Sequence, residues 1–191
     1  MKKLFALLLA AVMALSLVAC GTTKDTDTDG SEGDQAYAPT SALDLLTAVW
    51  DTYGEDDRFP VVGGGPDAEQ MVEDAPAAFD LTDRSLAEIN LVLPESAQVD
   101  EAASLTHMMN ANTFTAAAYH ASGDTQALAA ELRDAVQANR WMCGFPEKVT
   151  VTVVGEYVAV CFGDGDLVDA FTTALNGVTG AKPAYDEAVQ A

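Results

Sequence analysis

The strongest structural signals in the chain lie between Asp124 and Gly163, DTQALAAELRDAVQANRWMCGFPEKVTVTVVGEYVAVCFG. The first part of this segment predicts an amphipathic helix, because Asp124 is a suitable N-cap for the free amides of a first turn. A narrow, largely apolar stripe follows at helical spacing: Leu128, Leu132, Ala135, Val136 and Asn139. Gly144 and Pro146 stop the helix, since proline lacks an amide hydrogen and clashes with the preceding turn.

The second part of the segment predicts a β-hairpin. Two runs of alternating residues flank Gly155-Glu156, and glycine in first place favours a two-residue type II′ turn. This register pairs Val153 with Val158, Val151 with Val160 and Val149 with Phe162, and it places all six on one face. The opposite face then carries Thr150, Thr152, Val154, Tyr157, Ala159 and Cys161. We expect the core of the folded domain here.

Residues 99–121 allow two interpretations. Val99, Ala102, Ala103, Thr106 and Met109 could line a helix. Alternatively, residues 104–109 and 113–121 form a hairpin that turns at Asn110-Ala111-Asn112. The hairpin is favoured, because asparagine tolerates turn conformations and because alternate residues of 113–121 share one apolar strand face.

Helices are expected on both sides of these hairpins in the sequence. Ser41 and Asp44 have the spacing of a capping box before an apolar helical face, and short helices are expected at 67–74 and 83–91. Asp164 or Asp166 would cap a further helix that ends at Asn176-Gly177, and residues 178–191 have the composition of a frayed tail. The sequence therefore predicts one α+β domain over residues 40–177, with N-terminal helices followed by an antiparallel sheet of two hairpins and helices packed on one face.

The first 20 residues have the order of features found in an export signal. Lys2 and Lys3 precede an apolar run at 4–17, which is shorter than the roughly 20 residues of a membrane-spanning helix. The run ends in Leu17-Val18-Ala19-Cys20-Gly21, which resembles the lipobox of bacterial lipoproteins. The resemblance implies that residues 1–19 are a cleaved signal peptide and that Cys20 carries a thioether-linked diacylglycerol on the outer face of the cytoplasmic membrane. Residues 20–39 would then be a flexible acidic tether.

The charge balance limits the partners. The chain has 9 Lys and Arg against 30 Asp and Glu, which gives a formal net charge of −21. No basic stripe exists for a phosphate backbone, so we expect no nucleic-acid partner. Anionic lipid head groups would also repel the protein, so the lipid on Cys20 would be the membrane contact.

No motif in the sequence predicts a metal or a cofactor. His107 and His120 are thirteen residues apart and lack metal-ligand spacing, so both are expected to be strand or turn residues. Residues 25–30 begin like a calcium loop, but its twelfth position is Ala36. Gly63-Gly64-Gly65-Pro66 lacks the Lys-Ser/Thr of a phosphate-binding loop and is expected to be a turn.

Two cysteines remain in the folded part. Trp141-Met142-Cys143-Gly144-Phe145-Pro146 faintly resembles the thioredoxin centre, but the second cysteine is missing and the C-terminal end of a helix opposes thiolate formation. In the hairpin register Cys161 faces Thr150, so an extended connection places Cys143 too far away for a disulfide. Two packed free thiols are favoured over a bridge between Cys143 and Cys161.

The lipobox, the acidic tether, Met108–Asn112 and the run Arg140–Gly163 together resemble small surface lipoproteins of Gram-positive anaerobes. These belong to domain families of unknown function, and some carry labels such as bacteriocin transport accessory protein. The resemblance implies no catalytic residue. The leading hypothesis is a lipid-anchored, non-enzymatic binding or accessory module. The alternative is a small thiol-dependent redox or accessory enzyme that uses Cys143.

Overall fold

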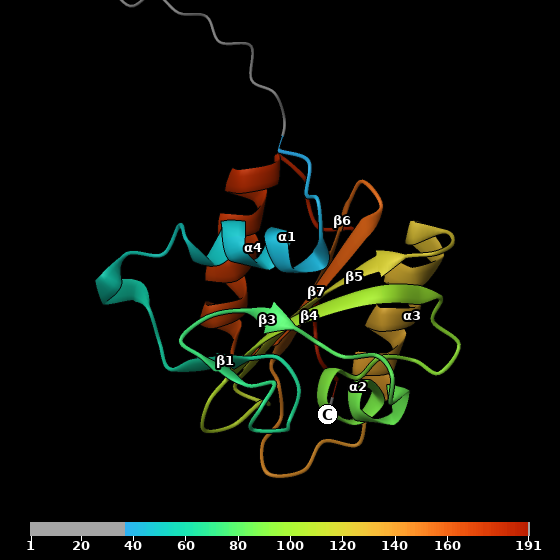
Figure 1. The fold of residues 1–191 in the computed structure, drawn as a ribbon, viewed down its shortest axis with the longest axis horizontal. Helices are drawn as coiled ribbons and strands as arrows, with labels where there is room; N and C mark the ends of the chain where they lie inside the picture. The colour runs from blue at the N-terminus through green and yellow to red at the C-terminus, as the bar shows by residue number, and fades with distance from the viewer. Residues whose placement is uncertain (1–36, 191) are drawn as a thin grey trace, which may run out of the picture. The chain divides into compact units, whose positions relative to one another are not determined.

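An antiparallel sheet of eight strands occupies the centre of the computed structural model, which describes residues 37–190 (Figure 1). The strands run in the order β2-β1-β4-β5-β7-β6-β8, and β3 also pairs with β4. Their bounds are β1 Val61–Gly63, β2 Val72–Glu73, β3 Ala77–Ala78, β4 Val99–His107, β5 Phe114–Ala121, β6 Lys148–Val154, β7 Tyr157–Gly163 and β8 Tyr185–Ala188. The helices are α1 Ala42–Trp50, α2 Arg84–Leu91, α3 Thr125–Ala138 and α4 Gly165–Thr179, with a short 3-10 helix at Glu55–Asp57. The expected signal peptide, Cys20 and residues 25–30 lie outside the described residues.

Both predicted hairpins are present. Strands β6 and β7 pair Val153 with Val158, Val151 with Val160 and Val149 with Phe162, which confirms the register. Gly155 has φ of +61° and Glu156 does not have a positive φ, as a type II′ turn requires. Strands β4 and β5 form the second hairpin, so the helical interpretation of residues 99–109 is wrong.

The α+β class and the antiparallel sheet are confirmed. The prediction that helices pack on only one face of the sheet is wrong, because helices cover both faces. Helices α2 and α3 pack on the face that carries Val151, Val160 and Phe162. Helices α1 and α4 pack on the other face, and they lie to the left of the sheet in Figure 1. The reason is that β5 and β7 are apolar on both faces: alanines such as Ala116 and Ala159 let α1 and α4 approach the sheet closely.

The C-terminal residues 178–191 are not simply a frayed tail. Helix α4 runs past Asn176-Gly177 to Thr179 and ends at Gly180, which has φ of +70°. Strand β8 then pairs with β6. Lys148 holds this edge strand, because its Nζ lies 2.7 Å from an Asp186 carboxylate oxygen and 2.5 Å from one of Asp169 on α4.

The helix expected at 67–74 is also wrong, since β2 occupies Val72 and Glu73 near its end.

Side-chain caps fix the starts of the four helices. Ser41, Asp83, Asp124 and Asp164 each accept a hydrogen bond from an amide of the following first turn, at 2.8–3.0 Å. The capping roles predicted for Ser41, Asp124 and Asp164 are therefore confirmed. The short helix expected at 83–91 is α2, and its C-cap is Val92 in the left-handed conformation.

His120 on β5 should titrate at a higher pH than a free histidine. Its Nδ1 lies 2.6 Å from an Asp100 carboxylate oxygen, and this hydrogen bond raises the pKa of His120 above 6.5. The ion pair with Asp100 therefore contributes its full stabilisation at pH values below about 6.5, the pKa of His120 in the unfolded chain. This stabilisation is lost as the pH rises through the higher pKa that His120 has in the folded protein. An NMR titration of His120 should show a lower midpoint in Asp100→Asn and an unchanged one in the control Asp80→Asn. An unchanged midpoint in Asp100→Asn would contradict the pairing.

Candidate functional site

All four methionines among residues 37–190 are exposed, and none of them belongs to the core. Met71 and Met108 are each 43% exposed, Met109 is 81% exposed and Met142 is 79% exposed. Val72 and Phe145, on the same segments, are also exposed. A folded domain normally buries such side chains, and an exposed apolar group of this kind marks an interaction site. We call these six residues, Met71, Val72, Met108, Met109, Met142 and Phe145, the methionine end.

The segments that carry the methionine end meet at one end of the sheet, at the bottom of Figure 1. They are the loop between β1 and β2, the turn at 108–113 and the connection at 139–147. Gly163, the last residue of β7, pairs with Phe114 at the start of β5 and with Lys148 at the start of β6. The loops that join these strands therefore leave the sheet at the same end. Sequence-distant loops are thus brought together by the strand register.

The described chain begins at the opposite end of the sheet. The Ala42 amide at the start of α1 donates to Glu101 Oε1 at 2.9 Å. Glu101 pairs with His120, and His120 pairs with Tyr157, which follows the β6–β7 turn. Whatever precedes α1 is therefore attached far from the methionine end.

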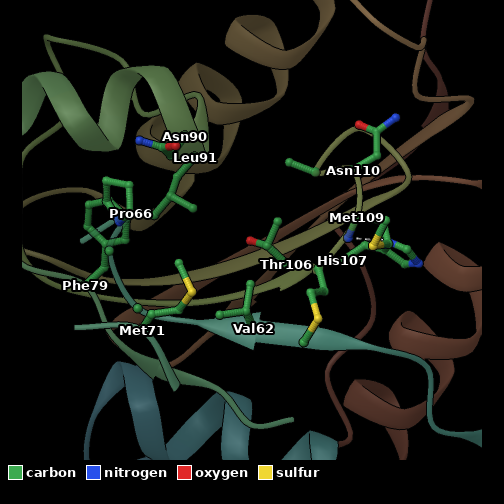
Figure 2. Close-up of a pocket in the computed structure, with 14 residues that line it drawn as sticks. Val62, Pro66, Met71, Phe79, Asn90, Leu91, Thr106, His107, Met109 and Asn110 are labelled. Atoms are coloured by element: carbon green, nitrogen blue, oxygen red, sulfur yellow. Dashed lines mark hydrogen bonds between the residues drawn. The ribbon is translucent and has the colours of Figure 1, made fainter. Parts of the chain in front are cut away.

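A cavity of about 260 Å³ lies within this end (Figure 2). In this view Leu91 approaches it from above, Met71 and Val62 from below, and Thr106 lies at an intermediate height. Phe79 adds an aromatic wall. Small-molecule sites usually measure roughly 300–1,000 Å³, so this cavity is better matched to one or two side chains of a partner.

The glycines at 63–65 shape the cavity wall and do not form a phosphate loop. Gly64 has φ of +89°, which favours glycine. Its amide donates to Ser104 Oγ at 2.9 Å, and its carbonyl accepts from the same hydroxyl at 3.0 Å. That amide is therefore already occupied. The turn expected at 63–66 lies further along the chain, because Gly63 ends β1 and the amides of Gln70 and Met71 donate to the Asp67 carbonyl.

Two asparagines fasten the 139–147 connection to the 108–113 turn. Asn112 Nδ2 donates to the carbonyls of Met142 at 2.7 Å and Gly144 at 3.0 Å. Asn110 Nδ2 donates to the carbonyl of Cys143 at 3.1 Å. These bonds hold Met142 beside the turn that carries Met109.

Inward-facing residues complete the anchoring of the 139–147 connection. Trp141 packs on Phe162, with ring centroids 5.3 Å apart, and Pro146 is buried. The intervening Met142, Cys143 and Phe145 are exposed. The connection is thus held at both ends and presents its apolar side chains to solvent.

The two thiols are free and have different environments. Cys161 on β7 is buried among α1 and α4, and burial raises the pKa of its thiol. Cys143 is exposed, with φ of +64°, so the expected packing holds for Cys161 and is wrong for Cys143. Cys143 lies in the connection that Asn110 fastens through the Cys143 carbonyl, and not in a strand or helix that faces the core.

Thiol labelling should separate the two cysteines. In the lipidated chain, where a thioether would block Cys20, we expect a maleimide to modify Cys143 in the native state at neutral pH, and Cys161 only after denaturation, without reductant. Mass spectrometry of the labelled peptides would identify each site, and Cys143→Ala serves as the control. Labelling of both thiols in the native protein would contradict the burial of Cys161, and a requirement for reductant would show a disulfide.

The two histidines are strand residues, as expected from the sequence. His107 Nδ1 accepts a hydrogen bond from the Met109 amide at 3.2 Å, and its ring stacks on Phe59 with centroids 6.1 Å apart. His107 thus supports the turn that carries Met109. Within residues 37–190, no group of three or more His, Cys, Asp or Glu side chains is placed to hold a metal ion.

The sequence distinguishes Met108–Asn112 and the Trp141–Pro146 run as separate motifs, but it does not indicate that they form one surface. The available signal was that Met71, Met108 and Met142 fall outside the periodic apolar stripes. None of the helices in the described part of the chain combines the length and hydropathy needed to cross a membrane.

Comparisons with protein-family models, with curated proteins and with solved structures give no match to this chain. The resemblance to small surface lipoproteins therefore stays a prediction.

Proposed function

We propose that this protein is a lipid-anchored binding or accessory module on the outer face of the cytoplasmic membrane, with no catalytic activity of its own. The methionine end would hold an apolar segment of a partner. The observation that carries this proposal is the position of the four methionines between residues 37 and 190, all exposed at one end of the sheet.

Methionine suits a binding surface of this kind. Its unbranched thioether side chain adapts to partners of different shape, and methionine-rich surfaces occur in promiscuous binding proteins. The cavity beside Met71 would accept an anchor side chain, while Met109 and Met142 would cover the flanking residues.

The proposed anchor leaves this surface free. A diacylglycerol on Cys20 would hold the chain at the membrane, and two acyl chains suffice for stable anchoring. The domain is reached through α1, whose start lies at the end of the sheet opposite the methionine end. The partner could therefore approach without displacing the tether.

The alternative function, thiol-dependent redox chemistry, draws support from the exposure of Cys143. Cys161 is the other thiol in residues 37–190, and it lies buried on the α1 and α4 face. A second thiol that could resolve a mixed disulfide is therefore not presented beside Cys143. The binding function is better supported.

A peptide selection tests the binding function. The mature chain in phosphatidylcholine nanodiscs would be used to select a phage-displayed random peptide library, with empty nanodiscs as counter-selection. We expect enriched peptides to carry bulky apolar residues and to bind the Met109→Ser/Met142→Ser variant at least about tenfold more weakly.

Ile89→Ser is the matched control, because Ile89 is 77% exposed but lies about 200° around the axis of α2 from Leu91, which lines the cavity. Peptides that bind the double methionine variant as tightly as the original protein would contradict the proposal. So would a failure to enrich any peptide.

A further inference from the structure

We propose that the partner bound at the methionine end is a basic peptide segment, in which lysine or arginine flanks an apolar anchor residue. This inference rests on the proposed binding function and adds the charge of the partner to it. It is carried by the juxtaposition of the apolar cavity with a loop that has only acidic charges.

The chain segment that contributes Gly64, Met71 and Phe79 to the cavity wall carries charges of one sign. Between residues 64 and 80 the chain has five acidic residues and neither lysine nor arginine: Asp67, Glu69, Glu73, Asp74 and Asp80. All five are exposed. The ion pairs formed within residues 37–190 involve none of them.

This acidic segment also builds the cavity. Gly65, Pro66 and Met71 line it, and Asp67 and Glu69 lie between them in the sequence. The other two loops of this end, 108–113 and 139–147, contain one basic residue, Arg140. A ligand in the cavity would thus meet apolar side chains at its centre and free carboxylates at its margin.

The basic residues elsewhere in the domain are mostly engaged. Arg133 pairs with Glu187, and Lys148 pairs with Asp169 and Asp186. Arg84 donates to the carbonyls of Pro94 and Ala97. The carboxylates at 67–73 have no comparable partner within the domain, so a cationic ligand would supply one.

Charge and apolar contact make separable contributions. Carboxylates at the edge of the cavity increase the association rate and select partners of positive charge, and salt screens their effect. The apolar anchor supplies most of the binding free energy and is insensitive to screening. A basic peptide without an apolar anchor should therefore bind weakly, and an acidic peptide with the anchor should be disfavoured.

Three synthetic peptides test the inference against the mature chain in phosphatidylcholine nanodiscs, by isothermal titration calorimetry with empty nanodiscs as the blank. One has leucines flanked by lysines, the second has the same leucines flanked by glutamates, and the third has serines flanked by lysines. At low salt the lysine–leucine peptide should bind about tenfold more tightly than either of the others. In 1 M NaCl the advantage over the glutamate peptide should largely vanish, because the screening length falls to about 3 Å.

A charge-neutralised variant locates the effect. Asp67→Asn/Glu69→Gln/Glu73→Gln should reduce the preference for lysine over glutamate to about threefold or less. The matched control Glu55→Gln/Asp56→Asn/Asp57→Asn removes the same charge from the exposed 3-10 helix, which does not line the cavity, and should retain the preference.

Each adverse outcome has a distinct meaning. Equal binding of the two leucine peptides would overturn the inference and leave the binding function standing. Equal binding of the lysine–serine and lysine–leucine peptides would overturn the inference, since the cavity would then contribute nothing. If no peptide bound and library selection against the original protein also failed, the proposed function would fall together with the inference.

Discussion

Replacing Gly163 with alanine is expected to lower the free energy of unfolding by about 3–5 kcal/mol, combining backbone strain with overpacking. Gly163 ends β7 with φ of +146°, a conformation that side chains disfavour. An alanine Cβ there would overlap the backbone of Thr113 and Phe114. Because these atoms lie where the 108–113 turn joins β5, they cannot move without displacing the turn, and the methionine end would be perturbed as well.

The matched control for this prediction is Gly155→Ala. Gly155 also has a positive φ, of +61°, but no atom lies within 4 Å of the position of its Cβ. Strain alone should then cost about 1–2 kcal/mol. Urea denaturation of both variants measures the difference. Equal stability of the two alanine variants would show that the close approach of β7 to Thr113 is incorrect.

Replacing Cys20 with alanine should move the protein from the membrane to the soluble fraction almost completely. The lipobox-like sequence implies a covalent lipid attachment at Cys20. We expect the acidic domain to be repelled by anionic head groups, so it would not replace the lost acyl chains as a membrane contact. Cell fractionation and detergent phase partitioning would measure the distribution.

Cys143→Ala serves as the control for Cys20→Ala, because it removes an exposed thiol without touching the lipobox. It should stay in the membrane fraction. Retention at the membrane of a Cys20→Ala variant from which residues 1–19 have been removed would contradict lipid anchoring. Mass spectrometry of the mature N-terminus would identify the modification directly.

Local patterns were sufficient to predict the central hairpin. The alternation of residues 149–153 and 158–162, together with a glycine at the first turn position, specifies pairing and register within fifteen residues of chain. Helix starts were predictable for the same reason, since Asp124 and Asp164 act on amides two and three residues away. These features depend on neighbours in the sequence.

The missed elements depend on distant partners. Tyr185–Ala188 carries no strand pattern, and it is held by Lys148 and by Arg133, whose guanidinium lies 4.7 Å from the centre of the Tyr185 ring. Strand β2 is likewise specified by its pairing with β1. The coverage of both sheet faces follows from alanines on β5, which are compatible with a solvated or a covered face.

The candidate site was predictable only in its parts. The sequence indicated a turn at Asn110-Ala111-Asn112 and a helix stop before Pro146. It could not show that Asn112 reaches across to the carbonyls of Met142 and Gly144, because that contact depends on the register of three strands. The exposure of the methionines follows from this long-range arrangement.

The most direct test of the methionine end is a methyl NMR titration of the mature chain in phosphatidylcholine nanodiscs, with the methyl groups of methionine, leucine and valine labelled with ¹³C. The predicted cleavage before Cys20 would remove Met1 and Met13, and each remaining methionine signal would then report on this end alone. On addition of the lysine–leucine peptide, we expect the signals of Met71, Met108, Met109 and Met142 to shift, while the labelled methyls of Val151 and Leu132 in the core stay fixed. Unchanged methionine signals, in the presence of binding measured by calorimetry, would place the binding surface elsewhere and contradict the account.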